Sequence, residues 1–138
     1  MSHPVFETRA MIAGMSPELL PGSFVFCSLP GGSASAALLD AALSVFREAE
    51  GQSLILPKAV AAARGLDTTS PMRLIRLNVH SSLEGVGLTA AVATALAAEG
   101  IACNMVAAYH HDHAFVPADR AAEALEILLR LQGSVAVR

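Results

Sequence analysis

The feature that most constrains the fold is a weak internal repeat. Residues 54–63 (LILPKAVAAA) align without gaps with residues 114–123 (AFVPADRAAE). In both segments an apolar run typical of a strand leads to a proline and an alanine-rich stretch, which predicts a helix that begins at the proline. Each segment follows a possible hairpin, and each hairpin follows a strand and a helix. The order of elements therefore predicts two βαββα units.

With a final strand added, this order is the ferredoxin-like pattern, an α+β fold. Its crossovers place both helices on one face of an antiparallel sheet. We expect an N-terminal unit with a lead-in segment over residues 1–66, a short linker over 67–71, and a C-terminal unit over 72–138. The other sheet face then needs a cover, which two units that pair within or between chains would provide.

Patterns along the first half predict the elements of the N-terminal unit. The hairpin is favoured by β-branched and aromatic residues, and a longer helix through residues 47–50 is its alternative. The predicted elements are a helix within 5–15, turns at 16–18 and 21–23, a strand over 24–29, a helix within 34–42, strands over 44–47 and 53–56, and a helix from Pro57 to Gly65.

In the second half, Ile75, Leu77 and Val79 alternate with polar residues, which predicts a strand with one buried face. The predicted elements are a strand over 72–80, a helix over 88–98 that ends by Gly100, strands over 101–109 and 114–116 around a turn at 110–112, a helix that Asp119 caps and Gly133 ends, and an edge strand or frayed tail at 134–138.

Composition limits the class of protein. Of 138 residues, 54% are hydrophobic and 15% charged, so the chain can bury a core, and its apolar content favours a homodimer. A net charge of −3 without a basic run argues against nucleic acid and anionic membranes as partners. No apolar run approaches the ~18 residues of a membrane helix, and residues 1–4 lack signal-peptide features, so we expect a cytoplasmic protein.

The loop at residues 81–87 (SSLEGVG) joins a predicted strand to a predicted helix. Free backbone N–H groups at such a helix start favour a carboxylate or another small anion. We expect the N–H groups near Gly87 and Leu88 to hold a ligand carboxylate, and Glu84 or an acidic group of a neighbour to pair with its ammonium. Plain helix capping is the alternative. Gly87→Val is expected to block the site and leave the fold mostly intact.

A resemblance sharpens this hypothesis. Residues 80–93 (HSSLEGVGLTAAVA), 100–104 (GIACN) and 109–117 (YHHDHAFVP) resemble a family of uncharacterised bacterial tandem ACT-domain proteins. The resemblance implies a regulatory fold of two ACT-like units that binds an amino acid at a unit interface, against the loop after the first strand. Val86 departs from the family's usual proline. The candidate ligand-binding residues are His80, Ser81, Ser82, Leu83, Glu84, Gly85, Val86, Gly87, Leu88 and Asn104.

Four polar residues, His110 to His113 with Asp112 among them, have side chains that bind metals. On a strand they alternate between faces, and two ligands on each face are too few for a closed site. We therefore predict a polar hairpin tip and no metal. The weaker alternatives are a metal site and a role in the ligand pocket or in pH-dependent assembly. Cys27 and Cys103 lie in apolar runs and are expected to be reduced and buried.

The sequence contains no recognisable catalytic motif. It lacks a Walker-type phosphate loop, a complete dinucleotide fingerprint and a nucleophile elbow. A His80–Ser82–Glu84 hydrolase would lack an oxyanion hole together with an orienting acid. We therefore expect no enzymatic activity and no cofactor. The favoured hypothesis is a homodimeric amino-acid-binding regulator, and the main alternative is a protein–protein interaction module without a small ligand.

Overall fold

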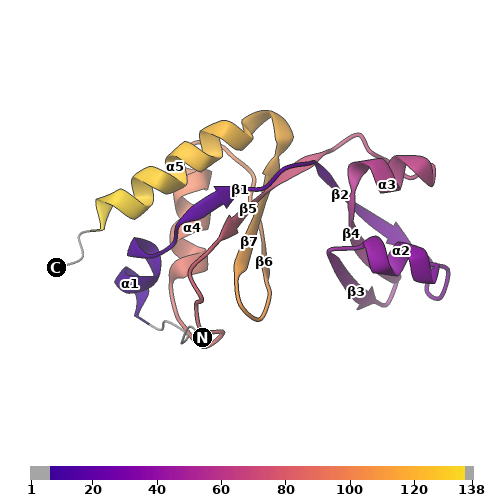
Figure 1. Ribbon diagram of the computed structural model, residues 1–138, viewed down its shortest axis with the longest axis horizontal. Helices are drawn as coiled ribbons and strands as arrows, with labels where there is room; N and C mark the ends of the chain where they lie inside the picture. Colours follow the sequence, from indigo (N-terminus) through magenta and orange to yellow (C-terminus); the bar gives the residue numbers. More distant parts are fainter. Residues whose placement is uncertain (1–6, 136–138) are drawn as a thin grey trace. The chain divides into compact units, whose positions relative to one another are not determined.

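The computed structural model describes residues 7–135, which fall into two compact units. One unit comprises Gly22–Met72, and the other the described parts of Met1–Pro21 and Arg73–Arg138. Both have the predicted α+β, ferredoxin-like architecture, with strands and helices in the predicted order (Figure 1). In the part of the chain that is described, no helix has the length and apolar character that crossing a membrane requires.

The Gly22–Met72 unit is a three-stranded antiparallel sheet covered by two helices. Its strands lie in the order β3–β4–β2, and the helices contribute Leu38 and Ala61 to a core with Val25, Leu54 and Leu56. Val25 pairs with Leu56 across the sheet, so these side chains share the face that both helices cover. The elements are β2 (Phe24–Leu29), α2 (Ala36–Ala41), β3 (Ser44–Glu48), β4 (Gly51–Pro57) and α3 (Lys58–Ala63). The hairpin, rather than the longer helix, is correct.

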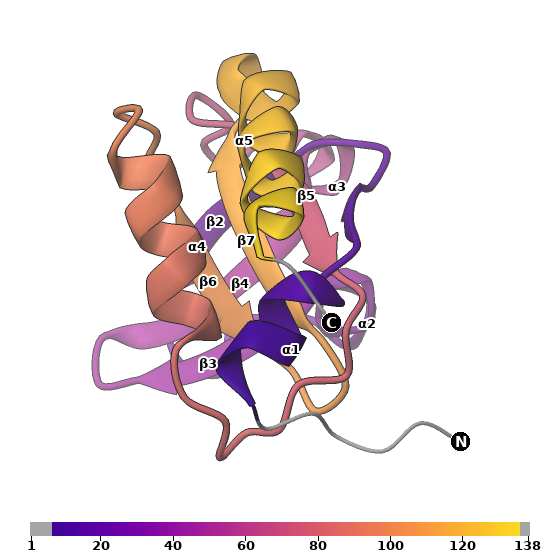
Figure 2. The same cartoon turned by 90° about the vertical axis from the view of Figure 1, so that its left-hand side faces the viewer.

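In the other unit β5 lies between β1 and β7, with β6 beyond β7. Helices α4 and α5 cover one face of this sheet (Figure 2). Ile75, Leu77 and Val79 are buried in the core as predicted, against Val92 and Leu96 of α4. The elements are α1 (Thr8–Ala13), β1 (Pro17–Leu19), β5 (Met72–Leu77), α4 (Leu88–Ala97), β6 (Asn104–Ala107), β7 (Asp112–Pro117), the 3₁₀ helix η1 (Ala118–Arg120) and α5 (Ala121–Ser134).

The internal repeat appears in the backbone itself. Pro57 ends β4 and precedes α3, and Pro117 ends β7 and precedes η1 and α5. The two prolines have nearly the same dihedral angles, φ −54° and ψ 135° at Pro57, and φ −53° and ψ 136° at Pro117. Each proline fixes the φ that a helix start requires, so the two strand–helix junctions have the same geometry.

The lead-in segment differs from the sequence-based boundaries. Where turns were predicted at 16–18, β1 pairs antiparallel with β5, and Pro17 lies opposite Leu77. Proline is tolerated there because it is the first residue of an edge strand. The buried side chain of Met15 and a 2.8 Å hydrogen bond from Asn78 Nδ2 to the Ser16 carbonyl also hold the segment. It therefore belongs to the unit of Arg73–Arg138, to which it supplies the additional strand.

Other differences are local. Asp119 does not cap α5, because a 3₁₀ turn precedes this helix, and Gly133 lies inside the helix rather than after it. Strand β6 is shorter than predicted, and residues 136–138 of the predicted tail lie outside the described part. Cys27 and Cys103 are free but only half-buried, and burial raises the pKa of both thiols.

Candidate functional site

The loop between β5 and α4 is tightened by its own hydrogen bonds. The Ser82 carbonyl accepts a hydrogen bond from the Gly85 N–H at 3.0 Å, and the Ser82 hydroxyl accepts one from the Glu84 N–H at 3.0 Å. Gly87 then begins α4 with φ +107°, a conformation that favours glycine. Because glycine has no side chain, α4 begins without a side-chain cap, and its first N–H groups have no partner within the helix.

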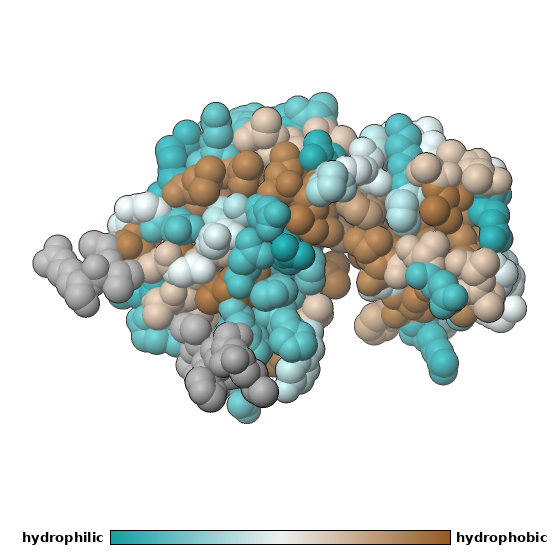
Figure 3. All heavy atoms as spheres, viewed as in Figure 1, coloured by the Kyte–Doolittle hydropathy of each residue, from teal (hydrophilic) through white to brown (hydrophobic). Residues whose placement is uncertain are grey.

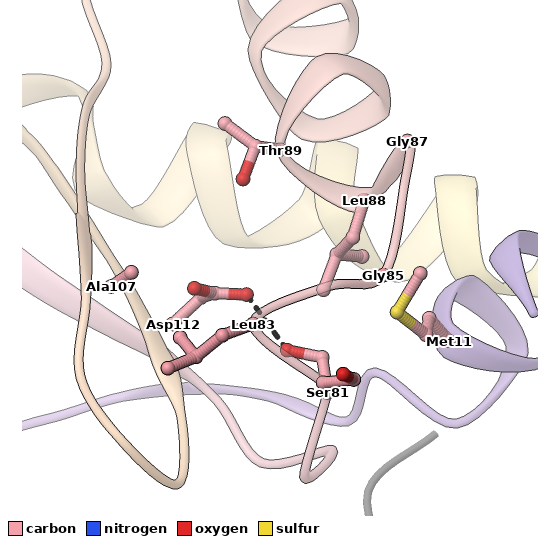
Figure 4. Close-up of a pocket in the computed structure, with 10 residues that line it drawn as sticks. Met11, Ser81, Leu83, Gly85, Gly87, Leu88, Thr89, Ala107 and Asp112 are labelled. Carbon is pink, nitrogen blue, oxygen red and sulfur yellow. Dashed lines mark hydrogen bonds between the residues drawn. The ribbon is translucent and has the colours of Figure 1, made fainter. Parts of the chain in front are cut away.

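This loop forms one wall of a cavity of about 150 Å³ (Figure 4). The other walls come from three elements of the same unit: α1 supplies Met11, β6 supplies Ala107, and β7 supplies Asp112. The lining residues are Met11, Ser81, Ser82, Leu83, Gly85, Gly87, Leu88, Thr89, Ala107 and Asp112. Such a volume is below the ~300–1,000 Å³ of pockets for drug-sized ligands, so the cavity suits a small molecule.

Asp112 is the main polar group of this cavity. Its carboxylate lies between the loop and the first turn of α4 (Figure 4), and its Oδ2 accepts a 3.0 Å hydrogen bond from the hydroxyl of Ser81. Ser81 is only 8% exposed, whereas Asp112 is half-buried. The cavity therefore contains an acceptor, the Asp112 carboxylate, and is bordered by the start of α4, where the helix dipole is positive.

Helix α1 holds the loop from the outside. The Thr8 hydroxyl donates a hydrogen bond to the carbonyl of Val86, and the buried Met11 side chain packs against Gly85. A Cβ added at Gly87 would lie 2.7 Å from Thr8 Cγ2. The nearest atoms all belong to the Thr8 side chain, and φ +107° strains a β-branched residue, so Gly87→Val is now expected to disturb the contact with α1 rather than leave the fold mostly intact.

A second cavity of about 310 Å³ shares Ser81, Ser82 and Leu83 with the first. His80, Glu84 and Tyr109 complete its lining. The ring centroids of His80 and His110 are 5.3 Å apart, and those of Tyr109 and His110 are 5.0 Å apart. The rim of this cavity is thus built from aromatic and imidazole rings and one exposed carboxylate, that of Glu84.

The ten predicted ligand-binding residues are divided by the structure. Six line the first cavity: Ser81, Ser82, Leu83, Gly85, Gly87 and Leu88. His80 and Glu84 line only the second cavity, whereas Val86, 76% exposed, and Asn104, an exposed residue of β6, line neither. Sequence reasoning missed Met11, Thr89 and Ala107, and it gave the cluster that contains Asp112 a role in the ligand pocket only as a weaker alternative. Of these residues, Thr89 alone could have been found from the sequence, because it lies in the first turn of the predicted helix beside the candidate loop.

The histidine cluster does not converge on a metal-binding geometry. Among residues 7–135, no three His, Cys, Asp or Glu side chains are grouped so that they could hold a metal ion. His113 Nδ1 lies 3.4 Å from the Val106 carbonyl, while Asp112 bonds Ser81. Burial lowers the pKa of His113, which disfavours its charged form.

Two family models match the chain. One ACT-domain model matches residues 6–73 and another matches residues 69–130. The two matches meet near the predicted linker. No curated protein matches this sequence.

Solved structures extend the likeness. A protein of unknown function from Vibrio cholerae, described as a possible transport protein, is 45% identical, and the match covers 88% of this chain and 92% of that one with a TM-score of 0.77. A protein from Agrobacterium tumefaciens is 17% identical over 84% of this chain and 87% of that one, with a TM-score of 0.66. The regulatory subunit of aspartate kinase from Thermus flavus is 12% identical over 83% and 95%, with a TM-score of 0.59. At such low identity, the last two share the fold alone.

Proposed function

Because the chain belongs to the ACT-domain family and carries two such domains in tandem, we propose that it is a regulatory protein that binds an amino acid at the β5–α4 loop. The observation that carries this proposal is the small cavity between the uncapped start of α4 and the carboxylate of Asp112. ACT domains are small-molecule regulatory domains, and the kinase subunit of similar fold is itself described as regulatory.

The ligand carboxylate binds at the N-terminus of α4. The first N–H groups of a helix point outward along its axis, and the helix dipole adds a partial positive charge there. Gly87 supports this role because it leaves the N–H groups without a side-chain cap. Leu83 and Leu88 line the same cavity and contact the apolar part of the ligand.

Regulation follows from where the ligand lies. An amino acid that contacts this loop together with a second ACT unit, of this chain or of a second copy, stabilises one arrangement of the two units. A protein that acts in this way needs no catalytic group, and we expect no enzymatic activity. We also expect the working form to be a homodimer.

Two partly exposed phenylalanines of the Gly22–Met72 unit support self-association. Phe26 of β2 and Ser44 of β3 both lie opposite Ile55 of β4. Phe46, two residues after Ser44, therefore lies on the same sheet face as Phe26, away from α2 and α3. Phe26 is 46% and Phe46 69% exposed, and apolar atoms reach the surface of this unit (Figure 3). The same face suits the second candidate function, docking of a partner protein without a small ligand. A monomer in sedimentation equilibrium would argue against the homodimer.

The experiment that tests the proposal is a thermal-shift screen of the twenty amino acids at millimolar concentration. A ligand at one hundred times its Kd adds about 2.7 kcal/mol, which is a shift of several degrees for a protein of this size. Ala107→Phe fills the cavity from β6, where an aromatic residue suits the strand, and is expected to abolish the shift. Ala108→Phe, one residue along and outside the lining, is the matched control and should keep it.

Each outcome distinguishes the candidate functions. A shift in the wild type that Ala107→Phe removes and Ala108→Phe keeps supports the cavity as the binding site. A shift that survives Ala107→Phe refutes this location. If no amino acid shifts the wild type, the proposed ligand class fails, and docking through the exposed face of Phe26 and Phe46 becomes the better explanation of the fold.

A further inference from the structure

We propose that Asp112 is the specificity-determining residue of this cavity, where it receives the ammonium group of an α-amino acid and excludes acids that lack one. This inference rests on the proposed function and adds the charge of the ligand that the site accepts. Glu84, which the sequence suggested for this task beside an acidic group of a neighbour, lines the other cavity and is exposed.

Charge is the first argument. Among the described residues that line the cavity, Asp112 is the one with an ionisable side chain, and neither lysine nor arginine faces it. A simple carboxylate bound at the α4 N-terminus would therefore bring a second negative charge beside Asp112 without a compensating cation. A zwitterion brings its own cation, which forms a charge-assisted hydrogen bond with Asp112.

Orientation is the second argument. The hydroxyl of Ser81, a residue that is 8% exposed, donates to Oδ2 of Asp112 at 3.0 Å. A carboxylate has about four acceptor positions, so one hydroxyl leaves room for a ligand ammonium on the same group. In Figure 4 the carboxylate lies inside the cavity, facing the first turn of α4 where Thr89 lies. Ser81 thus fixes the carboxylate in the orientation that the ligand meets.

Position along the chain is the third argument. Asp112 is the first residue of β7 and lies opposite Ala107 in the β6–β7 pair, and both residues line the cavity. The ladder of hydrogen bonds between the two strands fixes the backbone at Asp112 relative to Ala107. A ligand between Asp112 and α4 would contact the loop, the hairpin and the first turn of the helix together.

The test changes the charge and keeps the shape. Asp112→Asn retains an oxygen that can accept the hydrogen bond from Ser81, so the unliganded protein is expected to melt close to the wild type. Glu84→Gln is the same chemical change in the β5–α4 loop, outside this cavity. Each amino acid that shifts the melting temperature is titrated calorimetrically beside its α-hydroxy acid, such as L-lactate for L-alanine.

We expect Asp112→Asn to weaken amino-acid binding by at least about tenfold, since a hydrogen bond to a charged group contributes that much or more. Glu84→Gln should change it by less than about threefold, and the hydroxy acid should bind the wild type at least about tenfold more weakly than its amino acid. Equal binding of the amino acid by Asp112→Asn and wild type, or of the two acids by the wild type, would overturn the role of Asp112 and leave the proposed function standing. Absence of any amino-acid binding to the wild type would overturn both.

Discussion

The two strand–loop–helix junctions of the repeat differ at the start of the helix. Before α2, the Ser35 hydroxyl accepts a hydrogen bond from the Leu38 N–H at 3.2 Å and another from Arg64 Nη1 at 3.3 Å. Before α4, Gly87 provides no side-chain cap, and the junction borders the cavity whose other walls come from α1, β6 and β7. The same element order therefore yields a closed junction in one unit and an open one in the other. The candidate site follows from this local difference, because the repeated architecture alone would predict two.

The largest effect on the free energy of unfolding is expected when valine replaces a glycine in the loop before α4 or in the loop before α2. Gly87→Val places a β-branched residue at φ +107° and its Cβ against Thr8, so we expect a loss of about 3 kcal/mol or more in the free energy of unfolding. Gly32→Val, at φ +79° with nothing within 4 Å of its Cβ, meets backbone strain alone and should lose about 1–2 kcal/mol. Urea denaturation measures both, and equal losses would mean that α1 does not press on the loop.

A smaller loss of stability is expected at the junction before α2, where Ser35 caps the helix. Ser35→Ala removes the cap of α2 and should lower the free energy of unfolding by about 1 kcal/mol. Since Ser35 belongs to the unit without the cavity, the melting shift produced by a bound amino acid should be the same as in the wild type. A changed ligand shift would show that the two junctions are coupled, contrary to the comparison.

The smallest effect concerns pH. Burial lowers the pKa of His113 in the folded state, so the unfolded chain binds more protons near pH 6 and stability falls as the pH drops below about 6.5. His113 is half-buried, and we expect its contribution to be a fraction of 1 kcal/mol. His113→Gln should reduce the loss of stability between pH 7 and pH 5.5 in urea titrations. A pH dependence as steep as that of the wild type would exclude His113 as its source.

The two units also differ in their histidine content. Residues 22–72 contain no histidine, whereas His113, whose pKa is lowered by burial, belongs to the other unit. A loss of stability on mild acidification should therefore affect the unit with the open junction first. Hydrogen exchange of core amides in the two units, each compared with its intrinsic rate at the same pH, would reveal a difference of this kind.

Much of the fold was predictable because its signals are local. The alternation around Ile75, Leu77 and Val79 identifies a buried strand face, and Pro57 and Pro117 start helices through their fixed φ. The capping role of Asp119 was predicted wrongly, because residue type alone does not reveal that a 3₁₀ turn precedes α5. Likewise, the short run at Pro17 has the composition of a turn, and only its pairing with β5 makes it a strand.

By itself, the sequence determined the element order, the repeat and the loop at which to look for a ligand, since periodicity, proline and glycine act within a few residues of chain. Tertiary structure alone decided which segments enclose that loop. The hydrogen bond from Ser81 to Asp112 spans 31 positions, and that from Thr8 to Val86 spans 78. Such contacts depend on how β1, β7 and α1 pack around β5, which no local pattern encodes. The carboxylate of the candidate site thus became visible only in the folded chain.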